Sequence, residues 1–186
     1  MNVHTTYDHV TRLANEAPSA SAGWASLIDY LARRVDHRLL DSLRRVDIEM
    51  DVDAVRAQLL DLLADEPPPP ALCAVYFALV DDIDENDRPS IGYYVTGFDR
   101  FEPDDPEALT NPTWSPEHGC LRSVALRGVK KAELDARSLD GMTLLGYTAP
   151  LGAALILSRF ASRGLFPRCH RVVGLDSGGL AEITAD

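Results

Sequence analysis

Four consecutive prolines at residues 67–70 constrain the fold of this chain more than any other feature of its sequence. Proline has no amide hydrogen and disfavours helix in the residue before it, so no helix can run through this segment. Apolar residues recur about every 3.6 positions before the prolines and about every second position after them. The sequence therefore predicts one domain with a helical part (1–66), an extended proline linker (67–70) and a sheet part (71–186).

Three helices are expected before the prolines. The first begins at Thr5 or Thr6, the second is capped by Ser21, and the third covers residues 52–64. The second helix has an apolar stripe at spacings of three and four, formed by Trp24, Leu27, Ile28, Leu31, Val35, Leu39 and Leu43. Such a stripe indicates a helix that packs one face against the rest of its domain.

After the prolines the composition is typical of strands, with many β-branched and aromatic residues. Strands are expected at residues 71–80, 91–101, 120–129, 171–175 and 180–184, the last two as a closing hairpin. A short helix is expected at 130–139 and a buried helix at 148–163. The predicted fold class is α+β, with N-terminal helices followed by a mostly antiparallel sheet and a buried C-terminal helix.

The chain carries a formal net charge of −11, and this charge is unevenly distributed. Residues 1–119 contain 23 acidic and 9 basic residues, whereas residues 120–186 contain 6 acidic and 9 basic residues. Nucleic acids and anionic membrane surfaces would repel so acidic a chain, so neither is expected as a partner. The charge favours a basic protein partner. Acidity that serves only solubility is the alternative.

The sequence has no feature that indicates export or membrane insertion. Residues 1–6 lack the basic stretch and apolar core of a secretory signal. The longest apolar run, 151–157, is far shorter than the roughly 20 residues that a membrane span needs. The three cysteines, Cys73, Cys120 and Cys169, do not make a disulfide framework. We therefore expect a cytoplasmic protein.

The acidic residues are densest between residues 81 and 107, a segment that contains ten of them and only two basic residues, Arg88 and Arg100. This segment contains the loop between the first two predicted strands, so the charge is expected at one end of a hairpin that a partner can reach. Trp114, between Pro112 and Pro116, is either an interface anchor or an apolar plug that holds its loop to the body. The expected partner-binding residues are Asp81, Asp82, Asp84, Glu85, Asp87, Glu102, Asp104, Asp105 and Trp114.

No motif for catalysis, cofactor binding or metal binding accompanies this segment. The glycines do not form a phosphate-binding loop between a strand and a helix, and there is no Gly-x-Ser-x-Gly elbow. Residues 82–87 begin like a calcium loop, but Asp87 stands where glycine is required and Tyr93 where a bidentate glutamate is required. We therefore expect no catalytic residue, no cofactor and no metal.

Two histidine–cysteine pairs, His118 with Cys120 and Cys169 with His170, are the remaining candidates for chemistry. Their spacings differ from the two- to four-residue intervals that are usual in zinc sites. Buried structural cysteines are the simpler interpretation. A cysteine–histidine nucleophilic pair stays open as the basis of an enzyme. Whether the two pairs are close in space is not decided by the sequence.

The order of several segments also resembles a known group of proteins. These segments, which all lie within residues 71–184, are LCAVYFALVDD, IGYYVTGFDRFEPDDPEAL, NPTWSPE, LLGYTAPLGAALILSRFASRG and RVVGLDSGGLAEI. In this respect the chain is similar to poorly characterised bacterial proteins of the kind that act as immunity proteins beside polymorphic toxins. The resemblance implies a non-enzymatic protein that neutralises a toxin by binding it.

The hypothesis from the sequence is a protein-binding protein, an immunity protein whose acidic surface neutralises a basic toxin domain. One alternative is a small cytosolic enzyme that uses the cysteine and histidine residues named above. Another is a structural or regulatory module that associates with itself through its N-terminal helices. The identity of the toxin and the oligomeric state are left open.

Overall fold

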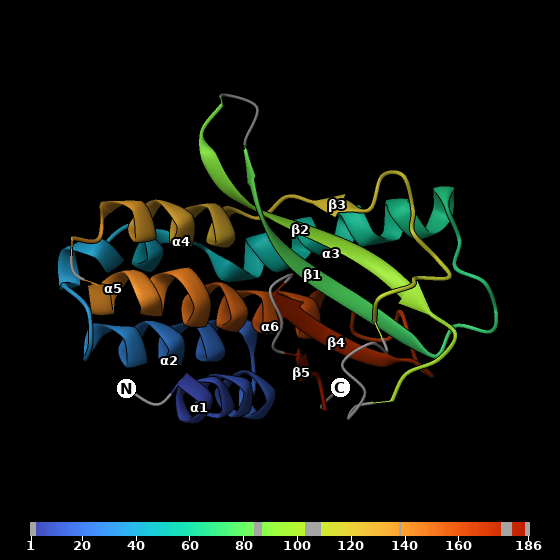
Figure 1. The fold of residues 1–186 in the computed structure, drawn as a ribbon, viewed down its shortest axis with the longest axis horizontal. Coiled ribbons are helices and arrows are strands. Elements are labelled where there is room, and N and C mark those ends of the chain that lie inside the picture. The colour runs from blue at the N-terminus through green and yellow to red at the C-terminus, as the bar shows by residue number, and fades with distance from the viewer. Residues whose placement is uncertain (1–2, 84–86, 103–108, 138, 176–179, 185–186) are drawn as a thin grey trace.

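The computed structural model describes residues 3–83, 87–102, 109–137, 139–175 and 180–184. Its helical elements are α1 (Val3–Glu16), α2 (Ala20–Ala32), the 3₁₀ helices η1 (His37–Leu40) and η2 (Leu43–Arg45), α3 (Ile48–Asp65), α4 (Val124–Asp135), α5 (Leu139–Thr143), the π-helical turn η3 (Leu144–Thr148) and α6 (Ala149–Ala161). Its strands are β1 (Ala74–Ile83), β2 (Pro89–Phe98), β3 (Cys120–Leu121), β4 (His170–Leu175) and β5 (Leu180–Glu182). The prolines at 67–70 separate α3 from β1, as predicted (Figure 1).

The five strands form one sheet in the order β3-β2-β1-β4-β5. β1 pairs with β2 along the whole length of both strands, from Ala74 opposite Phe98 to Ile83 opposite Pro89. The β1–β2, β2–β3 and β4–β5 pairs are antiparallel, and β1–β4 is parallel. The fold is α+β with a mostly antiparallel sheet, which confirms the predicted fold class.

The helices pack on one face of this sheet (Figure 1). Alternate residues of β1 point to opposite faces, and Val75, Phe77 and Leu79 belong to the main core shared with the helices. Ala74, Tyr76 and Ala78 point to the other face, where they form a second, smaller apolar cluster with Phe98 and Val172. β1 is therefore buried on both faces, as its nearly continuous apolar sequence predicts.

Helix α6 lies at the centre of the helical layer, and eleven of its residues are buried. At Gly152 it approaches α1 and α2 so closely that a Cβ atom would lie 2.7 Å from Val10 Cγ1 and 2.9 Å from Leu27 Cδ1. Ser158 of α6 is hydrogen-bonded to the buried hydroxyl of Tyr93 in β2, which joins the helical layer to the sheet. The burial of α6 confirms the prediction of a buried C-terminal helix.

Helix α6 continues from α5 and η3 as one apolar segment. Among the described residues, this 21-residue helix, Gly141–Ala161, is long and apolar enough by length and composition to cross a membrane. The sequence had suggested no apolar run of that length, because polar residues interrupt it. In the structure 78% of the most apolar 18-residue stretch of this helix is buried, so its apolar side chains are explained by their packing in the protein core.

The predicted strand at 120–129 is wrong. Only Cys120 and Leu121 pair with β2, and the chain then enters helix α4. Ser123 caps this helix by accepting a hydrogen bond from the Leu126 N–H, and its buried residues Ala125, Leu126, Val129 and Ala132 follow a helical period. The alternation that suggested a strand is therefore coincidental.

The boundaries of the N-terminal helices also differ from the prediction. Helix α2 is capped by Ser19 rather than Ser21 and ends at Ala32. The predicted apolar stripe extends beyond that end to Leu39 in η1 and Leu43 in η2, and of these two Leu43 is fully buried. Helix α3 is capped by Asp47, which accepts from the Met50 N–H, and is longer than predicted.

Candidate functional site

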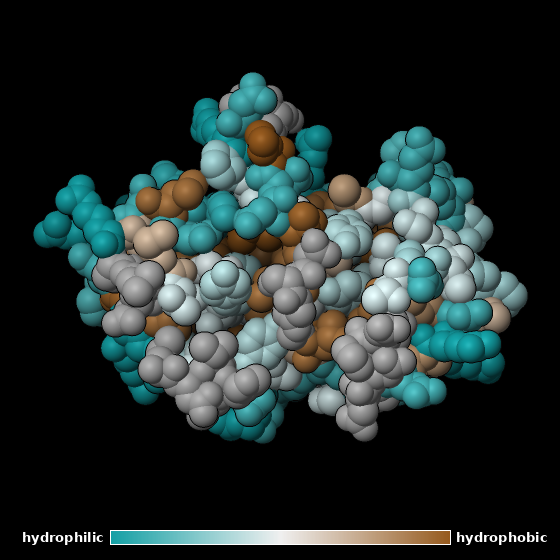
Figure 2. Space-filling view, viewed as in Figure 1, coloured by the Kyte–Doolittle hydropathy of each residue, from teal (hydrophilic) through white to brown (hydrophobic). Residues whose placement is uncertain are grey.

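The β1–β2 hairpin projects beyond the helices and the rest of the sheet (Figure 1). Its projecting end carries Asp81, Asp82 and Asp87, whose side chains are exposed. The hairpin is mostly hydrophilic in the space-filling view, with an apolar group among the polar ones (Figure 2). Three of the predicted partner-binding residues therefore lie on one prominent element, while Asp84 and Glu85 lie outside the described residues.

Ile83 is the exposed apolar side chain of this hairpin, with 64% of its surface accessible. It stands next to Asp82 at the end of β1, opposite Pro89 of β2. Ile83 is not among the binding residues predicted from the sequence. The signal that could have identified it is its place in the sequence between Asp82 and Asp84, because an apolar residue among acidic residues in a predicted loop is not expected to be buried in the core.

An ion pair joins Asp81 of the hairpin to helix α4. Lys130 Nζ lies 2.7 Å from Asp81 Oδ1 and 3.0 Å from Glu133 Oε2. Burial of Lys130 opposes its charged form, but the hydrogen bonds to Asp81 and Glu133 outweigh burial and raise its pKa above the ordinary value of 10.5. Asp81 is therefore partly neutralised, whereas no ion pair to a described residue involves Asp82 or Asp87.

The outer edge of β2 is covered only in part. Tyr93 and Tyr94 pair with β3, and Val95 donates its N–H to Gly119 O at 3.0 Å. Nearer the tip the edge lines a groove of about 450 Å³ between the hairpin and the start of α4. The groove residues include Asp82, Ser90, Ile91, His118, Cys120, Arg122 and Arg127. Pro89 at the start of β2 offers no N–H, which limits the pairing of another strand with this edge.

The acidic residues that follow β2, of which Asp99 and Glu102 are described, lie at the other end of this strand from the hairpin tip. Glu102 follows Phe98, whereas the hairpin tip precedes Pro89, so the ten residues of β2 separate the two segments. At about 3.3 Å per residue, that length is roughly 30 Å. The prediction that these acids gather at one end of the hairpin is therefore wrong for Glu102. Asp104 and Asp105 lie outside the described residues.

Trp114 is a buried plug, with only 7% of its surface exposed. Its backbone forms a bridge with Gly97 of β2, and its Nε1 donates to Glu66 O at 3.1 Å. A Cβ atom at Gly97 would lie 3.0 Å from Trp114 Cε3 and 2.5 Å from Leu72 Cδ1, so glycine permits this close packing. Of the two roles that the sequence allowed, Trp114 has the surroundings of a plug, and it presents little surface to a partner.

Glu66 holds the same loop from the end of α3. Its carboxylate accepts the backbone N–H groups of Glu117 at 2.9 Å and His118 at 3.1 Å, and it lies 3.2 Å from His118 Nδ1. The hydrogen bonds from the backbone of Glu117 and then of His118 lower the pKa of Glu66 below its ordinary value of 4.5. Glu66 therefore orders the segment that leads from Trp114 into β3.

The cysteine and histidine residues do not come together in one site. Cys120 lies on β3 and Cys169 directly precedes β4, so both β2 and β1 lie between them. His118 contacts Glu66, and His170 Nδ1 lies 2.7 Å from Glu182 Oε1. The described residues contain no group of three or more His, Cys, Asp or Glu side chains that could hold a metal. The alternative of an enzyme that uses all four residues loses its geometric basis.

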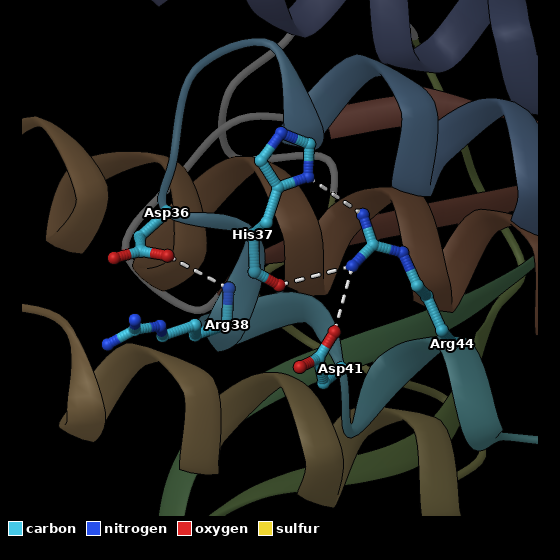
Figure 3. A network of polar contacts seen from close by, with 5 residues as sticks. All are labelled: Asp36, His37, Arg38, Asp41 and Arg44. Carbon is cyan, nitrogen blue, oxygen red and sulfur yellow. Dashed lines mark hydrogen bonds and ion pairs between the residues drawn. The ribbon is translucent and has the colours of Figure 1, made fainter.

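A polar network in the helical part contrasts with the acidic hairpin (Figure 3). Arg44 NH1 donates to Asp41 Oδ1 at 3.0 Å and to His37 O at 3.1 Å, and Arg44 NH2 lies 3.2 Å from His37 Nδ1. Asp36 caps η1 by accepting the Arg38 N–H at 2.9 Å. Residues 33–45 contain five arginines and two aspartates, so the exposed surface here is basic. A basic partner would therefore meet attraction at the hairpin and repulsion at this network.

Comparisons with protein-family models, with curated proteins and with solved structures found no match to this chain. What the hairpin does is therefore inferred from its own residues.

Proposed function

We propose that this chain binds a protein with a basic surface through the projecting end of its β1–β2 hairpin. The observation that carries the proposal is the combination of exposed carboxylates and exposed Ile83 on an element that extends beyond the body of the protein. Charged groups around an apolar side chain are a common arrangement at protein interfaces, in which a buried anchor is surrounded by a polar rim.

The two kinds of residue have different roles in the proposed interface. Asp82 and Asp87 attract a basic surface before contact and so raise the association rate. Ile83 enters an apolar pocket of the partner, where loss of its exposed surface to water slows dissociation. The Debye length is about 8 Å at physiological ionic strength, so salt screens the acidic residues that lie far from the hairpin. The charge of the hairpin itself therefore determines most of the electrostatic attraction of a partner to this site.

The partner class that fits best is a toxin domain whose basic cleft binds an anionic substrate. A hairpin with carboxylates at its end can occupy such a cleft and block substrate entry. The resemblance of residues 71–184 to immunity proteins favours the same class of partner. A cytoplasmic location, in the cell that makes the toxin, belongs to this proposal.

The test compares two pairs of isosteric substitutions that remove the same charge. Asp82→Asn with Asp87→Asn changes the hairpin end, where asparagine also tolerates the positive φ of 58° at Asp87. Asp99→Asn with Glu102→Gln changes exposed acids beyond the far end of β2. If the proposal is right, a toxin is encoded beside the gene for this chain, and that toxin is the binding partner to be used. The readout is the association rate as a function of salt concentration.

We expect the hairpin pair to lower the association rate roughly three- to tenfold at low salt and to flatten its salt dependence. The matched pair at Asp99 and Glu102 should change the rate less than twofold. Ile83→Ala should leave the association rate unchanged and raise the dissociation rate. Equal effects of the two charge pairs would exclude the hairpin as the specific site, and absence of binding to the neighbouring toxin would exclude the immunity role.

A further inference from the structure

A second pocket opens where the parallel pairing of β1 with β4 ends. Its volume is about 300 Å³, and its lining residues include Leu79, Asp81, Ile91, Tyr147, Pro150 and Leu175. Leu79 and Leu175 are register partners at the end of the parallel pair, and Pro150 lies in the first turn of α6. Small-molecule sites are mostly apolar clefts of about 300 Å³ or more that contain a few polar groups. The pocket therefore meets the lower size limit of a small-molecule site.

The wall opposite the strands is the π-helical turn η3. Short π-helical turns within α-helices occur frequently at functional sites. Gly146 of this turn lies against α4 so closely that a Cβ atom would be 2.9 Å from Glu133 Oε1. The next residue, Tyr147, lines the pocket and has 53% of its surface exposed. The turn therefore places an aromatic side chain at the pocket mouth.

The lining residues indicate the kind of ligand. Leu79, Ile91, Pro150 and Leu175 provide an apolar floor, and Asp81 is the only charged residue among the described ones that line the pocket. Lys130 engages Asp81 Oδ1, while Asp81 Oδ2 has no partner among the described residues. With Glu133 beside Lys130, this group contains two carboxylates and one ammonium, so its net charge is negative. A cation is favoured over an anion here.

We infer that this pocket binds a small amphipathic amine, with its apolar body on the floor of the pocket and its ammonium group on Asp81 Oδ2. Tyr147 lines the same pocket and adds an aromatic side chain against which the apolar body of the amine can pack. The inference does not depend on the proposed partner at the hairpin tip, because Asp82, Ile83 and Asp87 do not line this pocket.

The probe that tests this inference is 2-phenylethylamine, followed by NMR chemical-shift titration of labelled protein. A ligand of this size that fits the pocket should bind with a Kd on the order of 1 mM. The shifted amides should be those around Leu79, Tyr147 and Leu175. 3-Phenylpropionate has a similar apolar body with the opposite charge, so it should bind at least fivefold more weakly.

Two neighbouring substitutions provide a matched pair. Asp81→Asn removes the carboxylate from the pocket and should weaken binding of the amine at least fivefold. Asp82→Asn makes the same chemical change on the opposite face of β1 and should change binding less than twofold. Leu175→Phe, which fills the floor, should weaken the amine as well. The NMR spectrum of each variant shows directly whether it is folded.

Three results would overturn the inference: equal binding of the acid and the amine, equal effects of the two asparagine substitutions, or no shift at the pocket amides. None of them bears on the hairpin, whose test uses a protein partner. Loss of toxin binding with intact amine binding would likewise leave the pocket proposal standing.

Discussion

Replacing Asp51 with alanine should destabilise the protein strongly, because this carboxylate holds the start of helix α4. Asp51 lies on α3 and is only 4% exposed. It accepts hydrogen bonds from Ser123 Oγ at 2.8 Å and from the N–H groups of Val124 and Ala125, both at 2.9 Å. Alanine would leave these donors without their acceptor, two of them in buried positions.

The magnitude follows from the donors that are left behind. Each buried donor without a partner costs about 1–3 kcal/mol, and relief from burying a charge offsets part of that cost. We therefore expect a loss of about 3 kcal/mol in the free energy of unfolding. For a domain of this size, 1 kcal/mol corresponds to about 2–4 °C, so Tm should fall by about 6–12 °C.

The assay is urea unfolding followed by circular dichroism, together with a thermal melt. Asp53→Ala is the matched control, because Asp53 lies two residues away on the same helix and is exposed. Its effect should stay within about 0.5 kcal/mol. A result for Asp51→Ala within the same range would refute the reasoning that α3 caps α4 through this carboxylate.

Four further predictions concern the loop, the Glu66 clamp, the reactivity of the cysteines and zinc. Trp114→Ala should cost about 3–5 kcal/mol in urea unfolding, since it removes a buried indole and its hydrogen bond to Glu66 O; a loss below about 1 kcal/mol would show that Trp114 is not a plug. The pKa of Glu66 is lower in the folded protein than its ordinary value of 4.5, so ionised Glu66 stabilises the fold. This contribution is fully present at pH values above 4.5 and is lost as pH falls through the pKa of Glu66 in the folded protein. The stability difference between wild type and Glu66→Gln should therefore shrink in acid, and a difference that grows in acid would contradict the clamp. Burial raises the pKa of Cys169, and the neighbouring Cys73 raises it further, whereas Cys120 is exposed. Cys120 should therefore react with Ellman's reagent before Cys169 does, and mass spectrometry of the labelled protein can check this order. Elemental analysis should find no stoichiometric zinc, and about one zinc per chain that is lost on mutating Cys120 and Cys169 would contradict the geometry of these sites.

The parts of the fold that depend on local signals could be predicted from the sequence. The prolines at 67–70 and the change of apolar period around them indicated helices before a sheet. The apolar segment of β1 indicated a strand buried on both faces, and Pro150 with Gly164 marked the limits of α6. Each of these signals lies within the element that it describes, so no knowledge of distant contacts was needed.

The parts that depend on distant residues could not be predicted. Helix α4 begins where Asp51, 72 residues before Ser123, accepts its first N–H groups, and its β-branched Val124 and Val129 suggest a strand when viewed alone. The pocket at Asp81 exists because β1 pairs in parallel with β4, which lies far along the chain. The separation of Glu102 from the hairpin tip depends on where β2 ends, a boundary that periodicity does not fix.

The most direct test of the central claim is hydrogen–deuterium exchange of this protein, free and mixed with the proposed partner, a toxin domain that has a basic cleft. We predict that binding slows exchange at the described hairpin amides, residues 81–83, 87, 88, 90 and 91, while amides of η1 and η2 and residues 99–102 are unchanged. Protection confined to η1 and η2, with the hairpin unaffected, would contradict the account and would move the interface to the N-terminal helices.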